Sequence, residues 1–133
     1  MTSGHHPQIL IVEDDSLISE LMKRIVEIED HWQPTNVNSG IHAVEAWDNG
    51  NFDVILMDLR MPLMDGIEAT KQIREQESLS GRRRTPIIAF TVMTEYDYRQ
   101  KCIEAGMDDF IEKPGNIQKF VETIYKHLPD SQI

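Results

Sequence analysis

The feature that most constrains the fold is a short, nearly continuous apolar run at residues 52–57, which ends at Asp58. Such a run is typical of a strand that is buried on both faces of a parallel sheet. Parallel strands need helical connections that cover the sheet, so the run predicts an α/β domain. Asp58 would then lie at the carboxyl end of a strand, where open α/β sheets place their ligand sites. We therefore consider Asp58 a candidate reactive group.

Strand-like and helix-like segments alternate five times along the chain. Strands are predicted at residues 9–12, 34–38, 52–57, 86–91 and 109–112, of which 34–38 is polar enough to lie near an edge. Helices are predicted at about residues 17–28, 39–50, 65–74, 95–105 and 117–128. This alternation predicts a doubly wound domain: a five-stranded parallel sheet with helices on both faces. Residues 8–128 would form it, between a flexible tail at 1–7 and a second tail at 129–133.

Composition narrows the classes of function. The formal net charge of -10 would repel a phosphate backbone, so direct nucleic-acid binding is disfavoured. No apolar stretch approaches the ~20 residues of a membrane span, and the first residues lack a signal peptide's apolar core, so we expect a cytoplasmic protein without membrane contact. The single Cys102 is expected to be a buried apolar residue. The basic run at 82–84 is expected to be a solvated loop, the alternative being a docking patch for an acidic partner.

Polar side chains follow four of the predicted strands at one edge of the sheet. They are Glu13 and Asp14 after the first strand, Asp58 after the third, Thr91 after the fourth and Lys113 after the fifth. Any one of them alone is more often a helix cap or a solvated strand end, whereas their joint placement indicates a site. Crowded carboxylates repel one another unless a cation neutralises them, and Mg²⁺ prefers oxygen ligands. The sequence therefore predicts a magnesium site that includes Asp14 and Asp58.

The predicted site suits phosphoryl transfer. With a metal ion and a lysine to take up charge, Asp58 can act as a carboxylate nucleophile and form an acyl phosphate. Thr91 would donate a hydroxyl hydrogen bond and Lys113 would supply a cation to the other phosphoryl oxygens.

These residues closely resemble the receiver domain of two-component response regulators. The matching segments are ILIVEDD at 9–15, MDLRMPLMDG at 57–66, PIIAFT at 86–91 and AGMDDFIEKP at 105–114, and the resemblance covers about residues 8–128. It implies a flavodoxin-like receiver fold in which Asp58 accepts a phosphoryl group from a phosphohistidine. It also implies that Asp14, Asp58 and the backbone carbonyl of Arg60 bind Mg²⁺, and that Glu13 completes the acidic pocket.

The resemblance further implies a conformational switch. Thr91 and Lys113 would bind the phosphoryl oxygens, the Thr91 hydroxyl would move toward the phosphoryl group, and Phe110 would turn inward. As an alternative, Phe110 is a plain core residue. Phosphorylation and dephosphorylation would be self-catalysed, so we expect no enzyme acting on other substrates. A downstream effector protein or domain would respond to the switch.

Within this family the chain looks most like receivers of hybrid histidine kinases and multistep phosphorelays, on the segments MPLMDGIEAT and AGMDD. This implies that a histidine kinase or a histidine phosphotransfer domain docks near the first helix. The apolar arc of that helix is wider than the ~100° stripe that a core requires. Leu17, Ile18 and Leu21 would meet the partner, the alternative being a wholly buried helix. The chain ends soon after its last helix, so no output domain is expected within it.

Three positions would affect how long a phosphorylated state lasts. Arg60 and Met93 occupy positions that tune hydrolysis in this family. Val92 is bulkier than the Ala or Gly that commonly follows the threonine, so it would narrow access to the site. We therefore expect a long-lived phosphorylated state.

Other functions are less consistent with the sequence. A phosphatase with an aspartyl nucleophile generally has a second Asp two residues later as its general acid, and here that position is Arg60, which cannot donate a proton at working pH. A receiver-like module that signals without phosphate is disfavoured because all five expected side chains are present. A dinucleotide-binding enzyme is disfavoured because no Gly-rich phosphate loop follows the first strand.

Overall fold

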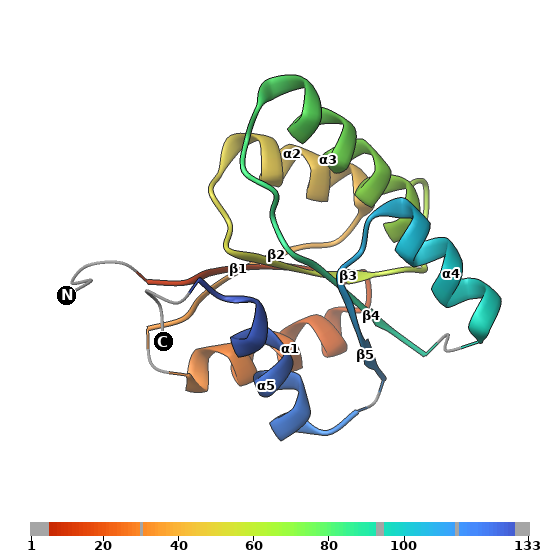
Figure 1. The fold of residues 1–133 in the computed structure, drawn as a ribbon. Coiled ribbons are helices and arrows are strands. Elements are labelled where there is room, and N and C mark those ends of the chain that lie inside the picture. The colour runs from red at the N-terminus through yellow and green to blue at the C-terminus, as the bar shows by residue number, and fades with distance from the viewer. Residues whose placement is uncertain (1–5, 30, 93–94, 114, 130–133) are drawn as a thin grey trace.

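The computed structural model describes residues 6–29, 31–92, 95–113 and 115–129, so Met93 and most of the two predicted tails lie outside the described residues. Within these ranges strands and helices alternate along the chain (Figure 1). The strands are β1 (Gln8–Val12), β2 (Gln33–Val37), β3 (Val54–Asp58), β4 (Ile87–Thr91) and β5 (Asp109–Glu112). The helices are α1 (Ser16–Ile28), α2 (Gly40–Asn49), α3 (Gly66–Ser80), α4 (Tyr96–Ala105) and α5 (Ile117–His127).

The strands form a parallel sheet in the order β2-β1-β3-β4-β5. Helices α1 and α5 cover one face, and α2, α3 and α4 cover the other (Figure 1). The predicted doubly wound architecture is therefore confirmed. Because every strand is parallel, the carboxyl ends of the strands lie at one edge of the sheet, and the loops that follow them meet there.

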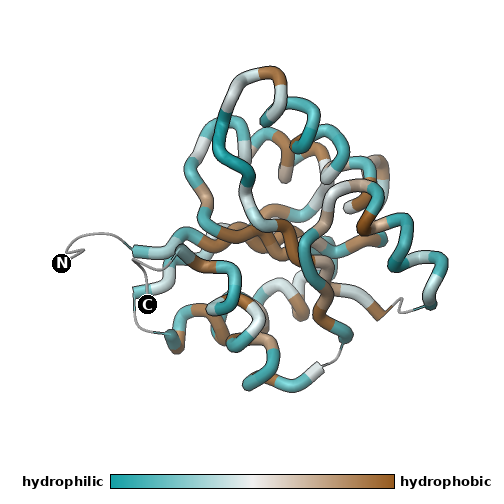
Figure 2. Tube along the Cα trace, viewed as in Figure 1, coloured by the Kyte–Doolittle hydropathy of each residue, from teal (hydrophilic) through white to brown (hydrophobic). Residues whose placement is uncertain are grey.

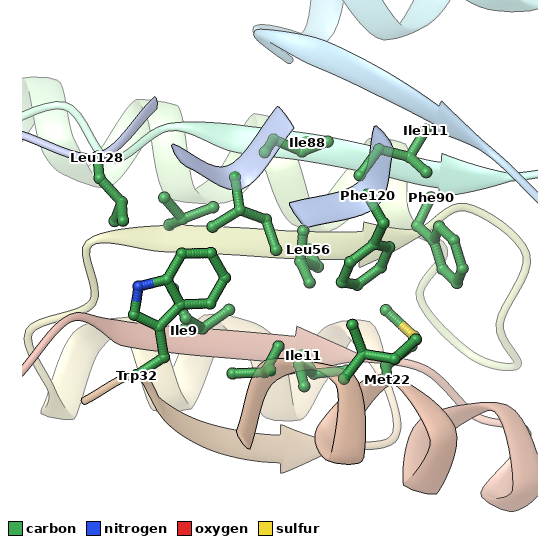
Figure 3. Packing of buried hydrophobic residues seen from close by; sticks show 14 residues of the cluster. Ile9, Ile11, Met22, Trp32, Leu56, Ile88, Phe90, Ile111, Phe120 and Leu128 are labelled. Carbon is green, nitrogen blue, oxygen red and sulfur yellow. The ribbon is translucent and has the colours of Figure 1, made fainter. Parts of the chain in front are cut away.

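The core lies on both faces of the sheet, where Figure 2 shows the apolar residues gathered. Strands β3 and β4 are buried along their whole length, which explains why their sequences are apolar without alternation. On the side of α1 and α5, Ile11 and Leu56 share a cluster with Phe120 (Figure 3). On the opposite side, Leu10 shares a cluster with Trp47 of α2. The sheet is thus the middle layer of three.

Two strands depart in detail from a simple apolar run. The edge strand β2 keeps exposed and half-buried residues, and Pro34 is tolerated there because one side of an edge strand needs no ladder partner. Strand β3 begins at Val54, two residues later than predicted. The buried Asp53 side chain accepts the backbone N–H of Gln8 at 2.8 Å instead of continuing the apolar run.

Cys102 is fully buried, as expected, and burial raises the pKa of its thiol to about 11. The thiol is therefore protonated at neutral pH and unreactive as a nucleophile. Across the described ranges, no helix combines the length and the apolar character needed to cross a bilayer.

Helix α3 is longer than predicted. The apolar spacing predicts an end near Arg74, but the helix continues to Ser80 and is capped by Gly81, which has a left-handed φ of 72°. Its last turns bury Glu77, which a search for apolar periodicity overlooks. The Glu77 carboxylate accepts hydrogen bonds from Arg74 and from the backbone N–H of Thr85, both at 2.8 Å. A buried carboxylate whose bonds are satisfied takes the place of an apolar residue.

The arginines at 82–84 lie in a loop, as expected, and Arg83 and Arg84 are exposed, whereas Arg82 is half-buried. The guanidinium of Arg82 lies 3.9 Å from the Trp47 ring centre and donates to the Trp47 carbonyl at 2.8 Å. Arg84 lies 2.6 Å from the Asp108 carboxylate. Asp108 also accepts from Arg74 at 2.8 Å and from the backbone N–H of Ile87 at 2.9 Å. The contacts of Asp108 hold the amino-terminal edge of the sheet together, and we call them the clamp.

Replacing Asp108 with alanine is expected to cost about 2 kcal/mol of unfolding free energy, because the backbone N–H of the buried Ile87 and one N–H of the largely buried Arg74 lose their acceptor. Urea unfolding of Asp108→Ala measures this loss. Asp48→Ala is the matched control, since Asp48 is 62% exposed and 3.6 Å from Arg82, and it is expected to change stability by less than about 0.5 kcal/mol. Equal losses in the two variants would contradict the clamp.

Candidate functional site at the carboxyl edge of the sheet

Three carboxylates meet at this edge. Glu13 and Asp14 directly follow β1, and Asp58 is the last residue of β3. The two strands are neighbours, with Val12 opposite Met57, so the acids that end them lie side by side. One oxygen from each carboxylate lies within 4.8 Å of the other two. Glu13 and Asp58 are buried and Asp14 is exposed, and the predicted convergence is confirmed.

A lysine that follows the edge strand β5 also reaches these acids. Lys113 follows β5, which β3 and β4 separate from β1. Its Nζ lies 2.6 Å from Oε1 of Glu13 and 3.3 Å from Oδ1 of Asp58. Its backbone N–H donates to the carbonyl of Thr91 at 2.8 Å, which holds this part of the chain against the end of β4. Lys113 therefore joins the site as expected.

Thr91 and Phe110 lie on the β4 and β5 side of the site. Thr91 is buried at the end of β4, whereas Phe110 is only half-buried. Both residues line a cavity of about 550 Å³ together with Lys113. The guanidinium carbon of Arg99 lies 4.3 Å from the centre of the Phe110 ring, a cation–π contact that the sequence did not indicate. Phe110 is thus not a fully buried core residue, and its inward movement stays a prediction.

Two nearby aspartates are helix caps, not members of the acidic pocket. Asp15 accepts two backbone N–H groups at the start of α1, at 2.9 and 3.0 Å. Asp65 accepts the N–H of Glu68 at 2.9 Å and begins α3. The backbone N–H of Asp15 also donates to Oε2 of Glu13 at 3.2 Å, which helps to orient that carboxylate. Of the three consecutive acids after β1, only the first two therefore face the site.

The start of α3 is pressed against the end of β3. The N–H of Gly66 donates to the carbonyl of Leu59 at 2.9 Å. A Cβ at Gly66 would overlap the carbonyl oxygen of Asp58. Only glycine allows this close approach, so the Asp-Gly pair at 65–66 fixes the backbone that carries Asp58.

Asp58 is the electrostatic centre of the site. Burial and the charge of Glu13 raise its pKa from 3.8 to about 7, against the opposite effect of Lys113. One ammonium group therefore does not neutralise the acids. A hard divalent cation suits three carboxylate oxygens and keeps water ligands, and the exposed Asp14 lines an opening of about 400 Å³ together with Arg60. The residues present thus fit a magnesium ion.

An exposed apolar surface adjoins the acidic pocket. Leu17 and Leu21 of α1 are 82% and 55% exposed, so the alternative of a wholly buried helix is wrong. Leu21 lines a groove of about 310 Å³ together with Val92, Ile117 and Lys113. Val92 is 61% exposed and lines this groove beside Lys113, and its effect on access to the phosphoryl site and on the lifetime of the phosphorylated state stays a prediction. We call Leu17, Leu21, Val92 and Ile117 the α1 surface.

Residues 9–125 match the family described as the response regulator receiver domain. Probable histidine kinase 1 of Oryza sativa subsp. indica is 32% identical over 155 residues, which cover 96% of this chain and 16% of the kinase. Hybrid signal transduction histidine kinase B of Dictyostelium discoideum is 35% identical, covering 91% of this chain and 7% of the kinase. The polar-differentiation response regulator DivK of Brucella ovis is 30% identical, covering 92% of this chain and 97% of DivK. The chain thus spans a small part of these kinases and nearly all of DivK.

Solved structures agree with this grouping. The co-crystal structure of the Saccharomyces cerevisiae phosphotransfer protein Ypd1 with the receiver domain of Ssk1 matches with a TM-score of 0.87 and 27% identity, covering 96% of this chain and 92% of that one. The receiver domain of the sensor histidine kinase PA1611 from Pseudomonas aeruginosa, with magnesium in its active-site cleft, matches with a TM-score of 0.82 and 33% identity, covering 92% and 98%. This chain therefore belongs to the receiver domain family of two-component response regulators.

Proposed function

We propose that this receiver domain is a phosphoacceptor switch in which Asp58 takes a phosphoryl group from a phosphohistidine of a partner protein. The observation that carries the proposal is the Asp58 carboxylate, buried at the end of β3 among Glu13, Asp14 and Lys113. Receiver domains act as phosphoacceptor switches, and they pair with histidine kinases and with phosphotransfer proteins such as Ypd1.

Asp58 is the nucleophile in the proposed reaction. One of its carboxylate oxygens attacks the phosphorus, the P–N bond breaks, and its electron pair goes to the imidazole nitrogen, which takes a proton from solvent. The Lys113 ammonium, 3.3 Å from Oδ1 of Asp58, balances the negative charge on the transferring oxygens. Oε1 of Glu13, 2.6 Å from the Lys113 Nζ, positions this ammonium group. The Thr91 hydroxyl donates to another phosphoryl oxygen. Attack by water on the acyl phosphate later returns Asp58 to its free form.

Glu13, Asp14 and Asp58 would hold Mg²⁺, together with the backbone carbonyl of Arg60. The ion supplies the positive charge that one lysine does not provide and favours the ionised form of Asp58. The opening beside Asp14 and Arg60 leaves room for the waters that Mg²⁺ retains.

The α1 surface provides a docking area for the protein that carries the phosphohistidine. Its apolar side chains are exposed, and Leu21, Val92 and Ile117 line a groove with Lys113, so a protein seated there lies next to the acidic pocket. After transfer, Thr91 and Phe110 would move, and a downstream effector would bind the altered β4 and β5 face.

Acetyl phosphate is expected to label the wild-type chain in the presence of Mg²⁺ and to leave Asp58→Asn unlabelled, because the amide is not a nucleophile. Asp15→Asn is the matched control, since asparagine preserves the helix cap and the variant should label normally. Phosphate-affinity gels and hydroxylamine lability measure the acyl phosphate. Label retained in Asp58→Asn would remove the site assignment, and turnover of p-nitrophenyl phosphate would favour a phosphatase.

In metal-free buffer, Asp58→Asn is expected to be more stable than the wild type at pH 8, with a difference that shrinks at pH 5. The folded-state pKa of about 7 lies above the ordinary value of 3.8, so ionisation of Asp58 lowers wild-type stability as the pH rises between these values. The expected difference at pH 8 is roughly 1–3 kcal/mol in urea unfolding with EDTA. Adding Mg²⁺ at pH 8 should stabilise the wild type more than the variant. A difference independent of pH would contradict the electrostatic origin.

Leu17→Glu is expected to slow phosphotransfer from phosphorylated Ypd1 by about tenfold, because a charge is placed in an apolar contact. The measured quantity is the transfer rate divided by the rate of acetyl phosphate labelling of the same variant. Leu79→Glu is the control, since Leu79 is 81% exposed near the distant end of α3. A normal ratio in Leu17→Glu would show that the donor docks elsewhere.

A further inference from the structure

The half-buried ring of Phe110 contacts an arginine of α4. The guanidinium carbon of Arg99 lies 4.3 Å from the centre of the ring, within the ~6 Å over which an aromatic face attracts a cation. Arg99 is exposed, and Phe110 packs on the outside of the core cluster that contains Leu10 and Trp47. The ring therefore lies between the core and a cation at the surface.

Phe110 is on the same face of the sheet as Thr91. In the parallel register Phe110 is opposite Ala89, and Thr91 lies two residues further along β4, so the three side chains point to one face. Ala89 is small and leaves space beside the ring. Thr91, Arg99 and Phe110 line the cavity of about 550 Å³ that also includes Lys113. The two proposed switch residues and Arg99 thus share one cavity.

The contact between Arg99 and Phe110 opposes the proposed switch. In that switch the Thr91 hydroxyl moves toward the phosphoryl group and the Phe110 ring turns inward. Arg99 is carried by α4, so the ring leaves the guanidinium when it turns. The cation–π contact therefore stabilises only the state with the half-buried ring. A contact that is made in one of two states shifts the equilibrium between them.

A purely structural role for Arg99 is the alternative, because the first half of α4 is weakly anchored. The buried residues of α4, Cys102 and Ala105, both lie in its second half. The capping residue Glu95 makes no side-chain hydrogen bond to the described part of the helix. Under this alternative, loss of the Arg99 contact loosens the helix and does not favour the inward ring. The two roles therefore differ in their effect on the binding of a phosphoryl group.

We propose that Arg99 restrains Phe110 in the half-buried state and so sets how much of the unphosphorylated chain has the ring turned inward. We call this contact the latch. The inference rests on the proposed function and deepens it, because it names the residue that regulates the switch before phosphorylation. Arg99 acts through Phe110 and is a positioning residue. Without the latch more chains have the ring turned inward, and a phosphoryl group, which favours that state, binds more tightly.

Beryllofluoride, which mimics a phosphoryl group on a carboxylate, tests the latch as a binding equilibrium. Its affinity in the presence of Mg²⁺ is measured from the fluorine NMR signal of the bound ligand. Arg99→Gln is expected to raise this affinity about threefold, the factor that an exposed cation–π contact supports. The direction of the change is informative, because loss of a positive charge near an anionic ligand would by itself lower the affinity.

A double-mutant cycle shows whether the effect passes through the ring. Phe110→Leu has no aromatic face, and in that background Arg99→Gln should change the affinity by less than about 1.5-fold. Arg99→Lys keeps a cation for the ring and should gain less affinity than Arg99→Gln. Lys119→Gln is the matched control, since Lys119 is exposed and lines the same cavity. It should leave the affinity unchanged or lower it slightly.

An affinity of Arg99→Gln at or below that of the wild type would overturn the latch and favour the structural role. A threefold gain that persists in the Phe110→Leu background would also overturn it, because the ring would then not be involved. If the wild type binds no beryllofluoride, the proposed function itself fails. If the wild type binds it and Arg99→Gln gives no gain that depends on Phe110, only the latch fails.

Discussion

The contact on which the site depends joins the Lys113 ammonium to Glu13 and Asp58. Glu13 and Lys113 are 100 residues apart in the chain, and only the strand order of the sheet brings them within 2.6 Å. Because the strands are parallel, the residues that end β1, β3 and β5 emerge at one edge, and a lysine is long enough to span the strands between them. The fold thus assembles a cluster of charges that no local segment of this sequence contains. The negative charge of that cluster exceeds its positive charge, and together with burial this raises the pKa of Asp58 to about 7 despite the lysine.

The buried strands and the converging acids are predictable from the sequence because both follow from local patterns. Strand β3 is apolar without alternation, and Asp58 marks its end. The end of α3 is not predictable in this way, because its buried face includes Glu77, whose charge is satisfied by Arg74 and by a backbone N–H beyond the helix. The roles of the arginines at 82–84 depend on Trp47 and Asp108, more than twenty residues away, and periodicity carries no information about such partners.

The sequence leaves open whether α1 is wholly buried, and it does not indicate the backbone of Leu63, whose φ of 70° lies in the left-handed region. A helix with a wide apolar arc is compatible with full burial or with a partner, and only the tertiary packing decides how much of Leu17 and Leu21 is covered. A leucine in the sequence does not indicate a left-handed backbone, because glycine and asparagine are the residues that commonly adopt one. The structure therefore decides between the two alternatives for α1, and it alone shows the conformation of Leu63.

The amino-terminal and carboxyl edges of the sheet therefore have different roles. At the amino-terminal edge, Asp108 gathers Arg74, Arg84 and a backbone N–H into contacts of 2.6 to 2.9 Å. At the carboxyl edge, the chain keeps a desolvated carboxylate and a strained loop, each of which lowers the stability of the isolated domain. A destabilised site is tolerable only if the rest of the domain is firmly held, so the clamp at one edge permits the reactivity at the other. Changes at the phosphoryl site can therefore stabilise the fold while they remove its function.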